Sequence, residues 1–337
     1  MVVTDFRENL SSKNLAPLWE VMSSLITREP HSACQAHLWE YDKIRPDLMA
    51  SGDIISAREA VRRVLILENP GMTGQSKITT SLYAGLQLVL PGEVAPCHRH
   101  SQSALRFVLE GEGAHTAVDG ERTMMSKGDF VITPSMAWHD HGNLSDQPMV
   151  WLDGLDIPIL QFFDASFVED LETDEQEIIR PPQTSQALYG QGLLPIENTH
   201  TNSCSPVFNY TYEKSRAALQ KVRESQPCDP HHGHKLHYAN PLDGGYAMPT
   251  IAAFLQMLPA GFASQEYQST DATILVCVEG SGTSTIRGRQ FNWQPNDIFV
   301  VPSWFPVTHS AKSDSILFSF SDRSVQEKLG FWREKKG

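Results

Sequence analysis

Two histidines separated by a single residue, His98 and His100, are the part of the sequence whose type and spacing best suit chemistry. Alternate side chains of a strand share one face, so both rings can point into one pocket, and His139 on another strand can supply a third nitrogen. Residues at set distances frame these histidines: Gly92, Gly128, Pro134 and Asn143. Three imidazoles with open coordination positions suit a catalytic metal site rather than a closed structural one. We therefore predict metal binding here, in preference to core or surface histidines without a ligand role.

These spacings resemble the two motifs of the cupin superfamily, G-x5-H-x-H-x3/4-E-x6-G and G-x5-P-x-G-x2-H-x3-N. The chain departs from them at two places. Ala104 or Leu105 stands where the usual fourth ligand, a glutamate, would fall, and Met136 replaces the glycine of the second motif. Longer blocks, among them HRHSQSALRF, WHDHGN, WLDGLDIP and YANPLDGG, resemble more closely the gentisate 1,2-dioxygenase family over most of residues 38–310. The missing glutamate agrees with that family, whose enzymes bind iron through three histidines.

The resemblance implies an Fe(II)-dependent, extradiol-type ring-cleaving enzyme that converts gentisate and O2 to maleylpyruvate in aromatic catabolism. Simple coordination chemistry agrees with this. The carboxylate and neighbouring hydroxyl of gentisate can chelate Fe(II) through two oxygens, and dioxygen needs a third position. Three neutral histidines leave three positions of an octahedron open, whereas a glutamate would occupy one and cancel one charge. Salicylate or 1-hydroxy-2-naphthoate as the substrate of the same chemistry remains an open alternative.

Arg106 and His141 are expected to act on the substrate beside the metal. Arg106 lies an even number of residues from the two histidines of the first motif, so on a continuous strand it shares their face. Its guanidinium can fork onto a carboxylate or hold a developing oxyanion, and the alternative is a surface arginine. His141 follows His139 by two residues and can accept or return a proton near neutral pH, the alternative being a histidine at the rim.

Residues on the strand before the first motif are expected to line the substrate pocket. Tyr83, Gly85 and Gln87 share one parity. The resemblance implies that Gln87 hydrogen-bonds a substrate oxygen, that Tyr83 bounds the ring and that Gly85 leaves space. An ordinary barrel strand with a mixed face is the alternative for Tyr83.

Positive charge for an anionic substrate is expected from one of two neighbouring arginines, Arg62 and Arg63. Only one of them can point inward, and the resemblance suggests that Arg62 reaches the substrate carboxylate. Asp153, on the strand after the second motif, is expected to accept a hydrogen bond from His141 or Arg106 at the substrate site. An ordinary strand aspartate that is satisfied locally is the alternative.

The elements that must position these residues change along the chain. Residues 1 to about 65 are expected to be mostly helical, with apolar spacing in LAPLWEVMSSLI and a second helix starting after Ser56. Residues 78–160 and 248–322 consist of short apolar runs separated by Gly, Pro and Asp, which predicts an all-β barrel or sandwich. Between them lies an acidic segment followed by a helical stretch, AALQKV.

The two β regions resemble each other, which indicates duplication of one β unit. LQLVLPGEVAP (86–96) matches FLQMLPAGFAS (254–264), and GDFVITPSMAWHDH (128–141) matches NDIFVVPSWFPVTH (296–309). With the resemblance, this predicts an all-β bicupin of two double-stranded β-helix (jelly-roll) barrels. The expected parts are a helical N-terminal arm (1–75), a cupin domain with the metal site (76–163), a linker with a helix (164–235), a second cupin domain (236–325) and a C-terminal tail (326–337).

The second unit is expected to be metal-free and structural. Tyr267 and Ser269 stand where the first unit has its histidine pair, and only His309 remains near the last ligand position. The tract DPHHGHKLH, residues 229–237, has the composition of a metal-binding segment. It lies outside the cupin pattern in a Pro/Gly-rich stretch, so we expect a loop there.

Composition narrows the class of protein further. The chain has 337 residues and a formal charge of −13, which argues against nucleic acid as a partner. No apolar run is long enough for a membrane span, and no signal peptide is visible at the N-terminus. The five cysteines are odd in number and form no C-x-x-C pair, which favours a reducing cytoplasm. The expected partners are a small aromatic hydroxy-acid and O2, and the resemblance implies a homotetramer.

Two other classes remain as alternatives. A cupin isomerase or decarboxylase that uses Mn or Ni would differ in consuming no oxygen, and the missing glutamate argues against it. A non-catalytic sugar-binding or regulatory cupin would not need a complete histidine triad.

Overall fold

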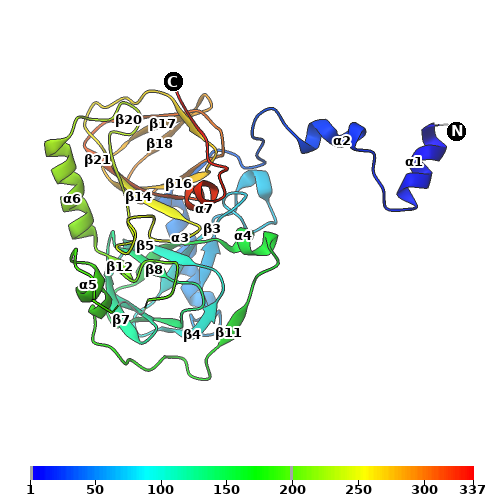
Figure 1. Cartoon of the computed structure of the whole chain (residues 1–337). Coiled ribbons are helices and arrows are strands. Elements are labelled where there is room, and N and C mark those ends of the chain that lie inside the picture. Colours follow the sequence, from blue (N-terminus) through cyan, green and yellow to red (C-terminus); the bar gives the residue numbers. More distant parts are fainter. Residues whose placement is uncertain (1–2, 198–199) are drawn as a thin grey trace. The chain divides into compact units, whose positions relative to one another are not determined.

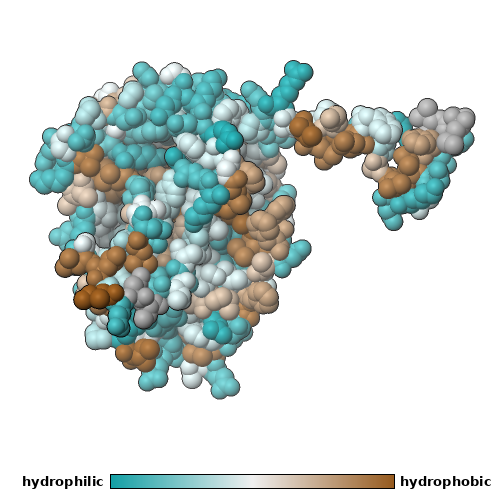
Figure 2. Space-filling view, viewed as in Figure 1, coloured by the Kyte–Doolittle hydropathy of each residue, from teal (hydrophilic) through white to brown (hydrophobic). Residues whose placement is uncertain are grey.

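The computed structural model describes residues 3–197 and 200–337. The N-terminal unit, which ends at His31, is separate from the unit Ser32–Gly337. It contains α1 (Val3–Ser11) and α2 (Leu18–Leu25). The helix predicted from LAPLWEVMSSLI is therefore confirmed. All the described apolar side chains of α2 are exposed, Trp19 at 73%, and they give this segment the brown surface of Figure 2.

The larger unit consists of two β barrels, each made of a six-stranded and a five-stranded sheet (Figure 1). The six-stranded sheet of the first barrel has the order β12 (Asn209–Tyr210), β8 (Phe130–Thr133), β5 (Ala104–Glu110), β10 (Met149–Leu155), β3 (Tyr83–Val89) and β2 (Val64–Ile66). Its five-stranded sheet has the order β11 (Val168–Asp170), β4 (Val94–His100), β9 (His139–Asn143), β6 (Glu112–Val118) and β7 (Glu121–Ser126).

The second barrel repeats this plan. Its six-stranded sheet has the order β1 (His37–Trp39), β19 (Ile298–Val301), β16 (Thr273–Glu279), β21 (Ser315–Ser321), β14 (Ala252–Leu258) and β13 (His234–His237). Its five-stranded sheet has the order β18 (Arg289–Trp293), β17 (Gly282–Ile286), β20 (Val307–Ala311), β15 (Tyr267–Ser269) and β22 (Glu334–Lys336). Strand β3 begins at residue 83 and β14 at 252, while β5 begins at 104 and β16 at 273, a shift of 169 residues in both pairs. The expected all-β, two-barrel architecture is confirmed.

The short helices lie outside the barrels. They are α3 (Tyr41–Ile54), the 3-10 turn η1 (Pro70–Met72), α4 (Ile157–Phe162), α5 (Thr184–Tyr189), α6 (Tyr212–Ser225) and α7 (Arg323–Lys328). Helix α6 contains the predicted AALQKV stretch. Among the described residues, no helix is both long and apolar enough to cross a membrane.

A shared apolar core joins the two barrels. The outward faces of the two six-stranded sheets contribute Leu86 and Phe107 from the first barrel, and Leu255 and Phe318 from the second. The rings of Phe107 and Phe318 stack with centroids 4.0 Å apart. Burial of apolar surface at about 25 cal/mol per Å² makes this contact a main source of the unit's stability. It also fixes the strands whose opposite faces point into the barrels.

Two local expectations are wrong. The helix predicted after Ser56 does not form, because turns occupy that segment up to Arg63 and β2 follows. The Arg63 carbonyl accepts a hydrogen bond from the backbone N–H of Leu88, and β2 pairs with β3, so tertiary pairing outweighs helical spacing. The histidine tract is not only a loop, since its second half is strand β13, paired with β14.

Candidate metal centre and active site

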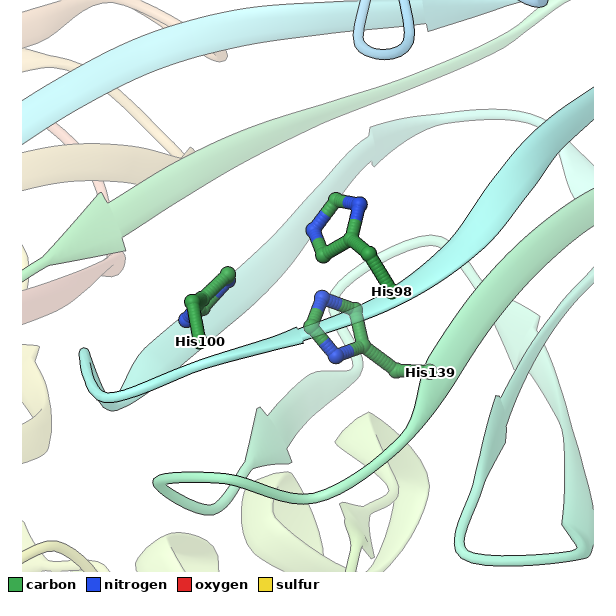
Figure 3. Close-up of side chains that lie close together, drawn as sticks. All are labelled: His98, His100 and His139. Carbon is green, nitrogen blue, oxygen red and sulfur yellow. The ribbon is translucent and has the colours of Figure 1, made fainter. Parts of the chain in front are cut away.

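Three histidines meet at one point inside the first barrel (Figure 3). His98 and His100 come from alternate positions of β4, and His139 is paired with His98 across β9. The ring centroids are 5.3 Å apart for His98 and His100, 4.6 Å for His98 and His139, and 4.8 Å for His100 and His139. One nitrogen of each ring lies within 4.8 Å of the others. The structure thus brings together all three residues that the sequence proposes as ligands.

Two of these rings, those of His100 and His139, are held in the form that a metal needs. Nδ1 of His100 lies 2.9 Å from the Gln102 carbonyl and Nδ1 of His139 lies 3.0 Å from the Ala137 carbonyl, so the Nδ1–H groups donate and the Nε2 lone pairs are free. Nε2 of His139 is buried without any hydrogen-bond partner. A buried, unpartnered acceptor of this kind is costly unless a ligand satisfies it. The donor set therefore fits a divalent metal ion.

The electrostatics of the site favour neutral imidazoles. Burial lowers the pKa of His98 to about 2 and that of His100 to about 4, with further lowering from nearby arginines. The pKa of His139 also lies well below its usual value, first because of burial and then because of Arg62. A neutral ring can coordinate a cation, whereas a protonated ring cannot.

A cavity of about 240 Å³ opens beside the histidines. Its polar walls include Arg62, Tyr83, Gln87, Arg106 and Asp153, five of the residues that the sequence singles out. Ala104, at the position of the absent glutamate, also lines it. Apolar side chains of Val64, Leu155 and Ile157 complete the wall.

Arg106 is a buried cation facing the cavity, with 3% of its surface exposed. Its Nη1 donates to Thr133 Oγ1 at 2.6 Å, and its Nε lies 3.7 Å from Asp153 Oδ1 without making a hydrogen bond. Asp153 also accepts from Trp151 Nε1 at 3.0 Å. Burial raises the pKa of Asp153 to about 6, while Arg106 acts to lower it. Arg106 therefore presents a positive charge to the cavity, and Asp153, 3.7 Å away, compensates that charge only in part.

The two neighbouring arginines point in different directions. Arg62 lines the cavity, where Nη1 donates to the Pro96 carbonyl at 2.9 Å and Nη2 is buried without a partner. Burial, with Arg106 as the next cause, lowers the pKa of Arg62 to about 9. Arg63 instead forms a bidentate pair with Glu93, at 2.8 and 2.5 Å. The structure thus places Arg62 in the cavity wall and gives Arg63 a structural ion pair.

Gln87 and Gly85, on the strand before the ligand motif, contribute to the site in different ways. Gln87 is 1% exposed, and its Nε2 has no hydrogen-bond partner, so a donor remains free at the cavity wall. Gly85 does not line the cavity, although it was expected to leave space there for the substrate. A Cβ added there would lie 2.4 Å from Val64 Cγ1 and 3.0 Å from Tyr83 Oη, so the missing side chain makes room for these residues.

His141 lies deeper in the barrel than expected. It is fully buried and does not line the cavity; its ring centroid is 5.8 Å from that of His139 and 5.4 Å from that of Trp151. Its Nδ1 lies 2.9 Å from Thr116 Oγ1, and its Nε2 has no partner. Burial holds the pKa of His141 well below its usual value.

Thr116 and Thr133 are two polar contacts of the site that the sequence analysis missed. Thr116 lies opposite His141 on β6, and Thr133 holds Arg106 from β8. Cross-strand neighbours depend on strand order and register, for which a single sequence offers no local signal.

Comparison with known proteins agrees with this geometry. Residues 85–155 match the family model described as "Cupin domain". The chain is 57% identical to gentisate 1,2-dioxygenase 1 of Aquipseudomonas alcaligenes, over 98% of this chain and 96% of that protein. It is 38% identical to a gentisate 1,2-dioxygenase of Streptomyces sp, over 96% of this chain and 92% of that protein.

A solved structure gives the same result. Salicylate 1,2-dioxygenase from Pseudoaminobacter salicylatoxidans, in its adduct with gentisate, superposes with a TM-score of 0.93 at 34% identity. The match covers 99% of this chain and 93% of that chain. Two barrels, a histidine triad and relatives matched along nearly their whole length lead to one conclusion. The chain belongs to the gentisate 1,2-dioxygenase family of ring-cleaving cupin dioxygenases.

Proposed function

We propose that the chain binds Fe(II) at His98, His100 and His139 and converts gentisate and O2 to maleylpyruvate. The observation that carries this proposal is the group of three neutral imidazoles beside Arg62 and the buried Arg106 in one cavity. The 57% identity to a gentisate 1,2-dioxygenase supports the choice of substrate. Fe(II), when bound, would supply the redox chemistry that lets dioxygen react with an aromatic ring.

The arginines bind the acid. Arg62 and Arg106 place two cationic groups on a cavity whose remaining wall is largely apolar. A carboxylate that leaves water needs charge-assisted hydrogen bonds, and a guanidinium provides them in a planar fork. The unpartnered Nε2 of Gln87 is a further donor for a substrate hydroxyl. Val64, Leu155 and Ile157 exclude water from the ring.

Proton transfer is assigned to His141, with Asp153 holding Arg106 in place. The free Nε2 of His141 is the only polar atom of that ring not already engaged, because Nδ1 faces Thr116. Since His141 lies behind the cavity wall, it acts on the substrate through a neighbouring group or a water molecule rather than by direct contact.

The second barrel is proposed to hold no iron. Its positions equivalent to the triad carry Tyr267, Ser269 and Val307, and Tyr267 pairs with Val307 as His98 pairs with His139. His309 corresponds instead to His141, since Ser284 faces it at 2.8 Å as Thr116 faces His141. We further propose a homotetramer in the cytoplasm, on the basis of the family resemblance. Sedimentation of the purified protein measures the number of subunits.

A second candidate is the same reaction on salicylate or 1-hydroxy-2-naphthoate. It is favoured by relatives named for those substrates, one a salicylate 1,2-dioxygenase and one a 1-hydroxy-2-naphthoate 1,2-dioxygenase of Nocardioides sp. at 34% identity. Turnover of all three acids by Fe(II)-reconstituted protein separates the candidates. A kcat/KM highest for gentisate supports the first proposal, and a higher value for either other acid supports the second. An isomerase or decarboxylase would consume no oxygen in the same assay.

A further inference from the structure

The second barrel contains a cavity at the place where the first barrel holds its histidines. It is lined by the positions equivalent to the triad, together with Lys235, Gln256 and His309. Its volume is about 40 Å³, against about 240 Å³ for the cavity of the first barrel by the same measure. A space of that size holds a few water molecules or one small ion, but no aromatic ring.

The wall of this cavity carries a lysine at a position where the first barrel has an apolar residue. Strand β13 pairs with β14 so that Lys235 lies opposite Gln256, as Val64 lies opposite Gln87 in the first barrel. Gln256 is 2% exposed and faces the barrel interior, so Lys235 shares that interior face. The apolar Val64 of the metal cavity is therefore replaced by a lysine in the second cavity.

The ammonium of Lys235 has no partner of opposite charge at contact distance. Its Nζ lies 4.6 Å from the centroid of the Phe254 ring, and no hydrogen bond or ion pair joins it to another described residue. Asp271, the carboxylate that also lines the cavity, accepts from Trp332 Nε1 at 2.8 Å and lies beyond ion-pair distance of Nζ. Burial lowers the pKa of Lys235 to about 8, while the nearby charge of Asp271 acts to raise it.

Hydrogen bonds fix the polar side chains beside the ammonium. Ser284 Oγ accepts from Trp293 Nε1 at 2.9 Å and lies 2.8 Å from Nδ1 of His309. When the Ser284 hydroxyl donates to Nδ1, the ring hydrogen of His309 lies on Nε2. The amide of Gln256 is fixed by donating to the His232 carbonyl at 2.7 Å.

From this cavity and a lysine that makes no ion pair in it, we infer that the second barrel binds one small monovalent anion on Lys235, of the size of chloride or formate. The site would give the histidine tract a role, because that tract supplies Lys235 together with His232, another lining residue. The inference concerns the second barrel alone and does not depend on the substrate of the first.

Thermal unfolding of the metal-loaded protein tests the inference at pH 7 in chloride-free buffer. Sodium formate is compared with sodium gluconate at equal concentration, because both are monovalent carboxylates and only formate fits a cavity of about 40 Å³. A ligand that binds only the folded state raises Tm, by about 2 °C at ten times its Kd for a chain of this size. We expect a saturable rise in formate, a similar rise in chloride and none in gluconate.

Three variants locate the effect. Lys235→Met should abolish the formate-specific rise, whereas Lys312→Met, at an exposed lysine of the same barrel, should retain it. Ser269→Leu fills the cavity from the position equivalent to His100 and should also abolish the rise, and it decides the question if Lys235→Met fails to fold. Equal shifts in formate and gluconate for the wild type, or a formate-specific shift that survives in Lys235→Met or Ser269→Leu, would overturn the inference.

Discussion

Arg106 offers the sharpest test of how the cavity binds its acid. Replacement by methionine, Arg106→Met, keeps an unbranched side chain of similar reach and removes only the guanidinium. Its recorded partners are Thr133 and Asp153, and neither is a proposed metal ligand. The variant should therefore retain its metal while losing substrate capture.

The magnitude follows from burial. Arg106 is 3% exposed, so a substrate carboxylate beside it exchanges water for a charge-assisted hydrogen bond in a cavity with little solvent. Loss of such a partner costs about 2–4 kcal/mol. At 1.4 kcal/mol for each factor of ten, kcat/KM should fall roughly thirtyfold to a thousandfold. Arg62 remains in the cavity and supplies a second cation, so some capture of the acid persists.

The assay is steady-state kinetics at matched metal occupancy, with the metal content of each preparation measured. Arg122→Met is the matched control, since Arg122 lies on the outer strand β7 and pairs with Glu175 at 3.6 Å. It should leave kcat/KM within about twofold of the wild type. A wild-type kcat/KM for Arg106→Met would place this residue outside the substrate site. Loss of metal from the variant would mean that Arg106 supports the triad instead.

Four further outcomes are expected. His139→Ala should lose both metal and turnover, and near-stoichiometric metal after purification would show that the triad is assigned wrongly. His309→Ala should keep the wild-type metal content of at most one ion per chain, whereas a fall in that content would place the second barrel in the metal site. Arg63→Met leaves the Glu93 carboxylate without its partner and should lower the free energy of unfolding in urea by about 3 kcal/mol; an unchanged midpoint would mean that the pair contributes nothing. Burial raises the pKa of Asp156 to about 6 from 3.8, so its contribution to stability is fully present below pH 3.8 and is lost as pH rises through about 6. Asparagine does not titrate, so the Tm of Asp156→Asn should rise relative to that of the wild type between pH 4 and pH 7. A constant difference in Tm would contradict this.

The metal centre was predictable because it depends on local spacing. His98 and His100 lie two residues apart on one strand, and side-chain alternation alone puts them on one face. The same rule correctly placed Gln87 and Arg106 on the cavity wall. These positions need only the period of a strand and no knowledge of its neighbours.

The depth of a side chain in the barrel, and the direction in which it points, were not predictable in the same way. His141 has the parity of His139, yet it lies behind the cavity wall, because parity gives the face of a strand and not the height along the barrel. The orientation of Arg63 is set by Glu93, thirty residues further along the chain. The segment after Ser56 has helical spacing but pairs as a strand once β3 is beside it. In each case a distant element decides, and its place depends on the whole fold.

Oxygen consumption by the Fe(II)-reconstituted protein with gentisate tests the central claim most directly. With isotopically labelled dioxygen, one O2 should be consumed for each gentisate, and both labelled atoms should appear in the ring-opened product. The His139→Ala variant, treated with iron in the same way, should consume none. Absence of oxygen uptake by the wild type, or incorporation of one labelled atom only, would contradict ring cleavage by a dioxygenase at the three histidines.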